Sequence, residues 1–329
     1  MTRRIIGLII SLALGLLMAP LTADAQPRVK LARIAVLGLS PASPASALPS
    51  YLEGFQAGLR ELGWIEGQNL TIEWRWAEGS LERFATLVDE VVRLPVEVMV
   101  VPNLTTAGVA QRVTTTIPII VMAGGSLAQV FPNLAQPGGN ITGFAGLGPE
   151  LSSKWLELLT QAIPGLTRVA ILRGLADQTQ PLQAMEVAAR ALGVQLQVLE
   201  ARDPTAIDQA IAAASREGAG VLVVFGNGGF FSLHRARIAE LAVTHRLPTI
   251  FGNRAFAEAG GLMSYGPSPT ERGYRVATYV DKLLKGAKPG DLPIEQPTTF
   301  EFVINLKTAQ ALGLTIPPTV LFQATEVIR

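Results

Sequence analysis

The 329-residue sequence contains no cysteine and only two histidines, and these shortages exclude several classes of site. Without cysteine there can be no disulfide framework, no thiolate metal site and no lipid-modified cysteine at the start of a mature chain. The histidines, His234 and His245, fall on one predicted helix, Ser232 to His245, among arginines and without an obvious carboxylate partner. We therefore interpret them as solvated surface residues and expect no metal site.

An excess of charge of one sign is also lacking. The chain has 27 basic and 26 acidic residues, and without residues 1–25 it would have 25 of each. A balanced charge provides no basic face for a nucleic-acid backbone, so we expect no nucleic-acid partner. Aromatic residues make up only 6% of the chain. Its tryptophans lie in predicted helix ends and strand interiors, which favours core packing or partial exposure over ligand stacking; they are Trp64, Trp74, Trp76 and Trp155.

Long apolar runs are scarce as well. One run, from Ile5 to Ala19, follows Arg3 and Arg4, and it is shorter than the roughly 20 residues that span a bilayer. It is followed by Ala23-Asp24-Ala25, a small-x-small pattern suited to signal-peptidase cleavage. The sequence thus predicts a signal peptide over residues 1–25, cleaved near Ala25, and a mature protein in the periplasm.

Motifs of catalytic sites are missing too. The nearest approach to a Gly-x-Ser-x-Gly nucleophile turn is "GGSLA", Gly124 to Ala128, which lacks the second glycine. There is no phosphate loop ending in Gly-Lys-Ser or Gly-Lys-Thr, and no Gly-x-Gly-x-x-Gly pattern follows the first strand. We expect neither a cofactor nor an enzymatic activity.

Strand-like and helix-like segments alternate along the rest of the chain. The first series comprises the strands "RIAVLGL", "NLTIEWRW", "VEVMVVPN" and "IPIIVMAG", with helices over Leu48 to Leu62, Leu81 to Leu94 and "LTTAGVAQRV". A second series follows the glycine-rich stretch from Gly138 to Gly148. It comprises "RVAILRG", "QLQVLEA", "GVLVVFG" and "PTIFGN", with helices over Ser152 to Ile163, Pro181 to Leu192, Pro204 to Glu217 and Ser232 to His245. Such alternation predicts parallel sheets with helices on both faces, and two series predict two α/β lobes.

The stretch "AGGLMSYGPSPTERG", Ala259 to Gly273, follows the second series. The helix predicted after it, Glu271 to Lys285, and the strand "TFEFVIN" would overfill a five-stranded lobe. We therefore interpret residues 262–268 as a crossover to the first lobe rather than a simple turn.

Small polar residues follow the predicted strands at their carboxyl ends, where ligands bind in open α/β sheets. The candidate ligand-binding residues are Ser40, Asn103, Thr105, Thr106, Gly124, Ser126, Phe144, Arg173, Asn227, Phe230, Asn253, Arg254 and Tyr265. Serine, threonine and asparagine at such positions also cap helices for purely structural reasons. We expect Arg254 to bind an anionic group with two hydrogen bonds and the three aromatic rings to stack on the ligand. Such a site suits a small organic solute with a charged group.

Four long segments resemble a known family. They are "GLRELGWIEGQNLTIEWRWAEG" (58–79), "LAQPGGNITGF" (134–144), "RIAELAVTHRLPTIFGNRAFAEAGGLMSYGPS" (237–268) and "YVDKLLKGAKPGDLPIEQPTTFEFVINLKTAQALGLTIPP" (279–318). These segments closely resemble the solute-binding proteins of ABC importers, in the branch that includes tryptophan- and other aromatic-amino-acid-binding members. The resemblance implies a type I periplasmic-binding-protein fold. In that fold two doubly wound parallel-sheet lobes are joined by three hinge crossovers and enclose a ligand cleft.

The resemblance also implies how this chain is divided. Lobe 1 would comprise residues 26–143 plus 266–298, and lobe 2 would comprise residues 144–265 plus 299–329. The crossovers would fall near Ile141 to Leu147, Leu262 to Ser268 and Pro297 to Phe300.

The implied function is that of a monomeric periplasmic receptor. It would capture an amino acid or an aromatic or other carboxylate compound and deliver it to the transmembrane subunits of an ABC permease. A ligand-sensing subunit of a signalling system and a secreted α/β enzyme remain alternatives. A sugar-responsive repressor of related fold is disfavoured, because the export signal occupies the position of its DNA-binding helices.

Overall fold

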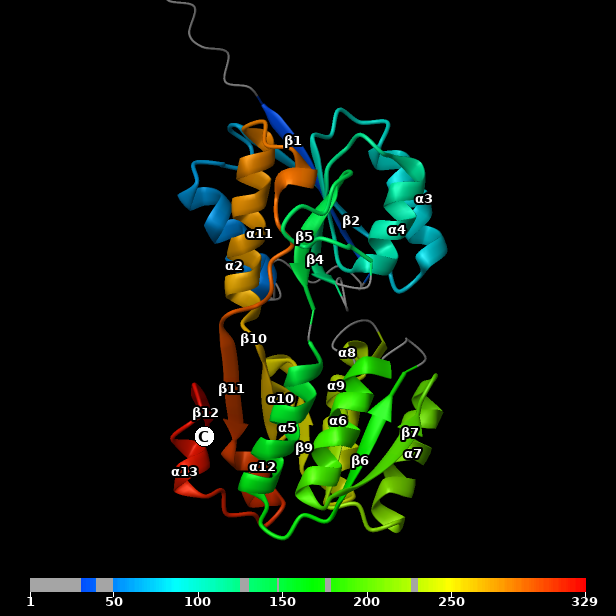
Figure 1. Cartoon of the computed structure of the whole chain (residues 1–329), viewed down its shortest axis with the longest axis vertical. Helices are drawn as coiled ribbons and strands as arrows, with labels where there is room; N and C mark the ends of the chain where they lie inside the picture. The colour runs from blue at the N-terminus through cyan, green and yellow to red at the C-terminus, as the bar shows by residue number, and fades with distance from the viewer. Residues whose placement is uncertain (1–30, 40–49, 125–129, 147, 175–178, 226–229) are drawn as a thin grey trace, which may run out of the picture. The chain divides into compact units, whose positions relative to one another are not determined.

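Two β-sheets, each covered by helices on both faces, organise the described part of the chain (Figure 1). The computed structural model describes residues 31–39, 50–124, 130–146, 148–174, 179–225 and 230–329, and residues 32–329 form one compact unit. The predicted signal peptide lies outside the described residues. No helix in these ranges is both long enough and apolar enough to cross a membrane.

The first sheet has five parallel strands in the order β2-β1-β3-β4-β5. Its strands are β1 (Ala32–Gly38), β2 (Leu70–Trp76), β3 (Val98–Val101), β4 (Ile119–Gly124) and β5 (Ile141–Ala145). Helices α2 (Ser50–Glu61) and α11 (Pro269–Leu284) cover one face, and α3 (Leu81–Val91) and α4 (Leu104–Val113) cover the other. On β1, Ile34 and Val36 pack toward α2 and α11, whereas Ala35 and Leu37 pack toward α3 and α4. All four are buried, as an uninterrupted apolar strand predicts.

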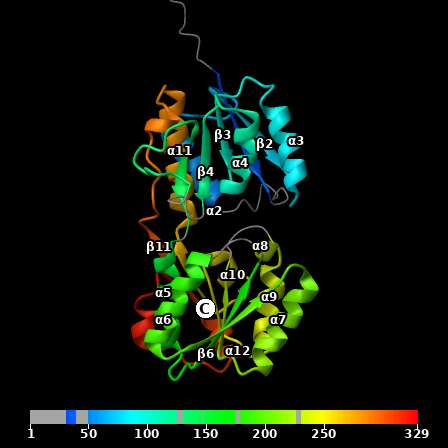
Figure 2. The same cartoon turned by 45° about the vertical axis from the view of Figure 1, so that its right-hand side comes forward.

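Helices α2 and α11 lie side by side although more than 200 residues separate them (Figures 1 and 2). A Cβ atom added to Gly54 of α2 would collide with the backbone of Thr270, and one added to Gly273 of α11 would collide with the backbone of Tyr51. Farther along, Gly58 lies against Ala277. Because the contacts advance in the same direction on both helices, α2 and α11 are parallel.

The second sheet has seven strands in the order β12-β11-β10-β9-β8-β6-β7. Strands β6 (Arg168–Arg173), β7 (Gln195–Glu200), β8 (Val221–Val224), β9 (Thr249–Phe251) and β10 (Met263–Pro267) are parallel. Strand β11 (Phe300–Asn305) pairs antiparallel with β10, and β12 (Glu326–Ile328) pairs parallel with β11.

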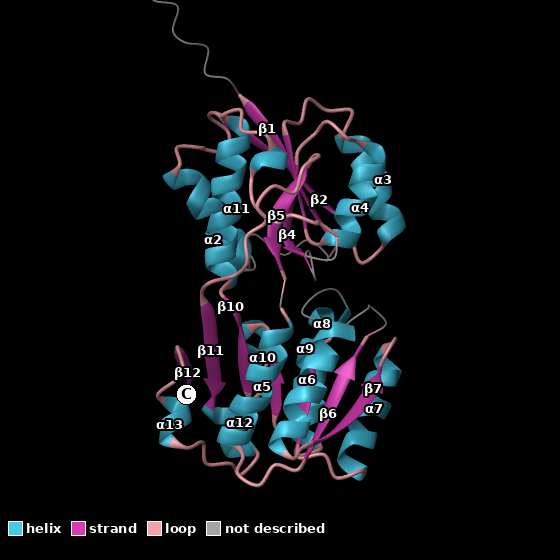
Figure 3. Ribbon diagram, viewed as in Figure 1, coloured by secondary structure: helices cyan, strands magenta, loops and turns pink. Residues whose placement is uncertain are grey.

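Helices again cover both faces of this sheet (Figure 3). One face packs against α5 (Pro149–Ala162), α6 (Thr179–Leu192), α12 (Leu306–Ala311) and α13 (Pro318–Leu321). The other packs against α7 (Pro204–Arg216), α8 (Phe230–Leu233), α9 (Arg235–Thr244) and α10 (Arg254–Glu258). The predicted α/β fold class with two parallel sheets is therefore confirmed, with the difference that the second sheet is only parallel-dominated, because β11 pairs antiparallel with β10.

Among the described elements, the chain passes from one sheet to the other three times. It leaves β5 for α5, leaves β10 for α11, and returns to β11 after the short 3-10 helix η3 (Pro289–Asp291). Before that return, Glu295 pairs with β5: Ala145 donates to its carbonyl at 2.8 Å and its own N–H donates to Gly143 at 3.0 Å. The predicted lobe boundaries at residues 143/144 and 265/266 cut through β5 and β10. The division into lobes stays a prediction.

Two predicted details need correction. The second sheet has seven strands rather than five, because β11 pairs back onto β10 and the three-residue strand β12 adds to β11. The predicted helix over Ser232 to His245 is interrupted: α8 ends at Leu233, and α9 begins after His234, whose φ and ψ of -101° and 15° are not helical. The histidines thus flank α9 instead of sharing one helix.

Candidate ligand-binding site

The carboxyl ends of the parallel strands bring several predicted residues to the edges of the two sheets. Gly124 ends β4, Arg173 ends β6, and Asn103 follows β3 directly after Pro102. Asn253 and Arg254 follow β9, after Gly252. Predicted residues Ser40, Ser126 and Asn227 lie outside the described residues.

Asparagine side chains at these edges cap helices. The Oδ1 of Asn103 accepts the Thr106 N–H at 3.0 Å, while the Thr106 hydroxyl accepts the Asn103 N–H at 3.1 Å, which is a reciprocal capping box at the start of α4. The Oδ1 of Asn253 likewise accepts the Ala255 N–H at 2.9 Å at the start of α10. Thr106 is fully buried and Thr105 is exposed. Of this group, Thr105 is the side chain that the structure leaves open to solvent.

The three predicted aromatic residues have different surroundings. Phe144 is only 5% exposed and packs on Tyr279, with 4.9 Å between ring centroids. A ring in that position belongs to the core, so the prediction that Phe144 stacks on a ligand does not fit the structure. Tyr265 and Phe230 are partly buried; Tyr265 stacks on Phe300 at 5.6 Å, and Phe230 lies 4.8 Å from the ring of His234.

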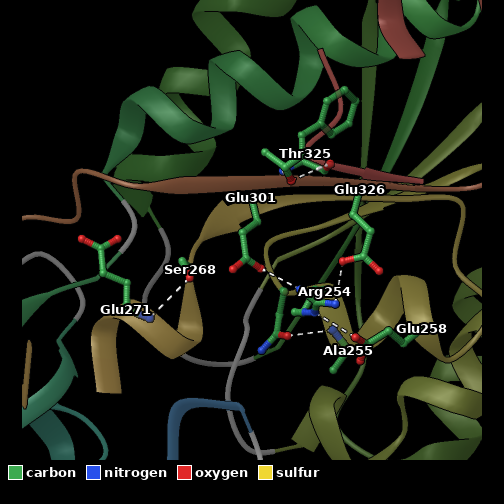
Figure 4. A network of polar contacts seen from close by, with 10 residues as sticks. Arg254, Ala255, Glu258, Ser268, Glu271, Glu301, Thr325 and Glu326 are labelled. Carbon is green, nitrogen blue, oxygen red and sulfur yellow. Dashed lines mark hydrogen bonds and ion pairs between the residues drawn. The ribbon is translucent and has the colours of Figure 1, made fainter. Parts of the chain in front are cut away.

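Arg254 is the centre of a charge cluster (Figure 4). Its guanidinium donates to Glu258 at 2.8 Å, to Glu326 at 2.8 Å and to Glu301 at 3.4 Å, and so joins α10 to β11 and β12. Burial opposes the charge on Arg254, but the hydrogen bond to Glu258 and the charges of all three carboxylates outweigh that burial and raise the pKa of the guanidinium. Since three carboxylates already surround it, the prediction that Arg254 binds the anionic group of a solute does not fit the structure.

Arg173 is also engaged. Its Nε and Nη2 donate to Glu200 at 3.2 and 2.6 Å, and the hydrogen bond from Arg173 holds the pKa of that carboxyl below its usual value. Arg173 and Arg254, the two arginines among the candidate residues, therefore both form ion pairs with glutamates of the protein itself.

Replacing Arg254 with glutamine should lower the free energy of unfolding by about 1–3 kcal/mol, because partly exposed ion pairs contribute up to about 1 kcal/mol each and three carboxylates would be left close together. Urea denaturation at low ionic strength measures the change, and 1 M salt should shrink it by screening. Arg83→Gln is the control: it breaks the pair to Glu78, in which both side chains are more than half exposed at 52% and 57%. Equal losses for the two variants would contradict the role of the cluster.

Trp74 and Trp76 form an aromatic pair that the sequence did not single out as a site. Their rings are parallel within 9° at 6.2 Å, both side chains are partly buried, and Trp76 is the last residue of β2. Alternation in "WRW" puts both rings on one face of the edge strand. Trp155, by contrast, is 1% exposed, so core packing or partial exposure, as predicted, describes these three tryptophans.

One hollow in the described part of the structure is not lined by any candidate ligand-binding residue. A hollow of about 390 Å³ runs beside α4 and is lined by side chains that include Gln111, Phe131 and Ile141. Its lining contains none of the candidate ligand-binding residues. Within the described ranges, no group of three or more His, Asp or Glu residues could hold a metal ion.

Comparison with known proteins identifies the family. A family described as "ABC transporter substrate binding protein" matches residues 43–328. The chain is 22% identical to a tyrosine-binding protein of Clostridioides difficile (strain R20291), over 84% of this chain and 81% of that protein.

Two solved structures are similar throughout. A conserved domain protein from Vibrio cholerae O1 has a TM-score of 0.81 and is 25% identical, with 91% of this chain and 100% of that chain covered. A Streptococcus pneumonia ABC domain in complex with L-Trp has a TM-score of 0.80 and is 25% identical, with 90% and 99% covered. Because the family match spans most of the sequence, the protein belongs to the ABC transporter substrate-binding proteins, a family of ligand binders and not of enzymes.

Proposed function

We propose that the protein is the periplasmic solute receptor of an ABC importer and that its solute is an amino acid or an aromatic acid. The family match over residues 43–328 carries the proposal. The relatives named for tyrosine and for L-Trp support the solute class, because both ligands combine an aromatic ring with a carboxylate. Tyr265, in the middle of β10, and Phe230, at the start of α8, are partly buried and provide aromatic surface for such a ring.

The topology suits a receptor that closes on its ligand. Three passages of the chain join the two sheets, and a few residues in such passages can absorb the backbone rotation of a hinge. A solute held by groups from the carboxyl edges of both sheets would stabilise the closed state, since a ligand shifts an equilibrium by its differential affinity for the two states. The receptor would then present the closed form to the permease.

Export is part of the proposal. Residues 1–25 would direct the chain across the inner membrane and be removed near Ala25. N-terminal sequencing of the protein recovered from a periplasmic extract should begin near Gln26. Recovery of the uncleaved chain from the cytoplasm would contradict this part of the proposal.

Binding should appear as stabilisation of the mature protein. L-tryptophan, L-tyrosine, L-leucine and benzoate are the first probes, and a bound solute at a hundredfold excess over its dissociation constant should add about 2.7 kcal/mol to the free energy of unfolding. Thermal shift finds the ligand, and calorimetry confirms a one-to-one complex in the micromolar range. D-glucose serves as an unrelated solute. If no amino acid or aromatic acid stabilises the protein, the proposed solute class is wrong.

A further inference from the structure

Arg272 occupies an unusual position on α11. Val276, Tyr279 and Leu283 are buried and pack on the five-stranded sheet. Arg272 precedes Val276 by four residues and Tyr279 by seven, so it lies on the same stripe of the helix. A cation therefore occupies the amino-terminal end of the stripe that faces the sheet.

This end of α11 lies at the carboxyl edge of the sheet. The ring of Tyr279 contacts Phe144, the second-last residue of β5, and Arg272 lies about 10 Å farther toward the start of the helix at 1.5 Å per residue. Helix α2, which runs parallel to α11, begins after the carboxyl end of β1. Since long side chains on a helix point toward its amino terminus, the guanidinium extends to the edge where the strands end.

Arg272 has no partner within the described residues: no side-chain hydrogen bond or ion pair is formed there. Other cations of α11 have partners, because Arg275 pairs with Glu295 and Lys282 lies 5.2 Å from the ring centroid of Tyr279. Arg272 is partly buried, and this burial lowers the pKa of its guanidinium without a carboxylate to offset it. Residues 40–49, which precede α2, include no aspartate or glutamate.

A desolvated cation without a counter-charge is costly, and an anion that pairs with it recovers that cost. Arg254, the arginine that the sequence favours, has three carboxylates around it instead. The two arginines thus differ in whether the described residues already neutralise their charge.

We propose that Arg272 binds the carboxylate of the solute and so selects amino acids and organic acids over uncharged solutes. This inference rests on the proposed receptor function and assigns to Arg272 the receptor's specificity for acidic solutes. The guanidinium matches a carboxylate with two parallel N–H to oxygen hydrogen bonds, which lysine cannot reproduce. A solute without an acid group would leave the cation unpaired.

The test pairs variants with matched ligands. Wild type, Arg272→Gln and Arg272→Lys are titrated by calorimetry with L-tryptophan, L-tyrosine, L-leucine and benzoate, and with the amide of each. For the acid that binds wild type most tightly, Arg272→Gln should weaken binding by at least about 30-fold, as expected for a lost buried charge pair. The affinity for the matching amide should change less than about threefold. Arg272→Lys should recover part of the loss.

Two further measurements distinguish a role of Arg272 in ligand binding from a role in stabilising the fold. Arg60→Gln, an exposed arginine in the last turn of α2, removes the same charge from the far end of the same helix pair and should leave affinity unchanged. The ligand-free Arg272→Gln protein should unfold at a denaturant concentration no lower than wild type, because the variant removes a cation that has no partner in the described part of the chain. A purely structural arginine would lower that midpoint.

The inference is overturned if Arg272→Gln binds the acid as tightly as wild type does, if it weakens acid and amide equally, or if wild type binds only uncharged solutes. In each of these cases the protein still binds a small molecule, so the proposed receptor role stands, and only the third case also overturns the proposed solute class. A wild-type protein that binds no small solute at all contradicts both.

Discussion

Replacing Gly273 with alanine is expected to lower the free energy of unfolding by roughly 2–4 kcal/mol, since overpacking against fixed atoms costs about 1–3 kcal/mol and occasionally more. The added Cβ would meet the carbonyl oxygen of Tyr51 and the amide nitrogen of Phe55. Both are backbone atoms of α2, so no side chain can rotate away. Relief therefore requires a shift of the α2 or α11 backbone.

Gly108 provides the control, because it is also a helical glycine but has open space where a Cβ would be added. Gly108→Ala should leave stability unchanged or raise it by up to about 1 kcal/mol, the ordinary gain from alanine in a helix. Urea unfolding of both variants measures the difference. If Gly273→Ala is as stable as Gly108→Ala, the close approach of α2 and α11 is not as the structure describes it.

The same substitution tests how the proposed carboxylate site is held. Gly273 directly follows Arg272, and its contact with Tyr51 sets the spacing between the first turns of α2 and α11. Wider spacing would displace the guanidinium from the edge of the sheet. Gly273→Ala should therefore weaken the binding of an acid solute even at temperatures where the variant remains folded.

Local patterns predicted the central strands well. The runs that became β3 and β8 are apolar throughout and fully buried, and β6 is apolar and buried between Arg168 and Arg173, which is the pattern that parallel sheets require. Helix α4 covers the predicted "LTTAGVAQRV", because Asn103 and Thr106 form a capping box that can be recognised from local sequence.

Pairing between distant segments was not predictable in this way. Strand β11 pairs with β10 although α11, which lies between them in the chain, packs on the other sheet. Nothing in either segment specifies an antiparallel partner more than 30 residues away. Short elements such as β12 and α13, of three and four residues, have too few positions for a periodic pattern.

Charge partners explain why the site was only partly predicted. Arg254 meets Glu301 and Glu326, which lie 47 and 72 residues away in sequence, so its neutralisation was invisible until the fold brought them together. Arg272 did have a sequence signal, since it lies at the start of the stripe that continues with the apolar residues Val276 and Tyr279. A cation on the buried face of an amphipathic helix is rare unless it has a partner, and the described residues supply no acid to Arg272.

Removing the side chain of Trp155 should have the largest effect on stability. Trp155 is 1% exposed, packs in the core between α5 and the seven-stranded sheet, and donates its indole N–H to the Tyr265 carbonyl at 2.7 Å. Trp155→Ala should cost about 3–5 kcal/mol, as is typical when a large buried aromatic ring is deleted. Urea unfolding, followed by far-UV circular dichroism because a fluorophore is removed, measures the loss.

Trp155→Phe separates the hydrogen bond from the packing, because phenylalanine keeps most of the ring and lacks the donor. It should cost about 1–3 kcal/mol, the penalty for a partly buried carbonyl left without this partner. Trp74→Phe is the control: it removes an indole bond of 3.4 Å to Glu66 that is exposed, so water can replace the bond. Its cost should stay below about 1 kcal/mol. If the two phenylalanine variants lose the same stability, burial of the Trp155 bond has no energetic consequence. Packing alone would then hold α5 against β10, the two elements that adjoin the first and second connections between the sheets.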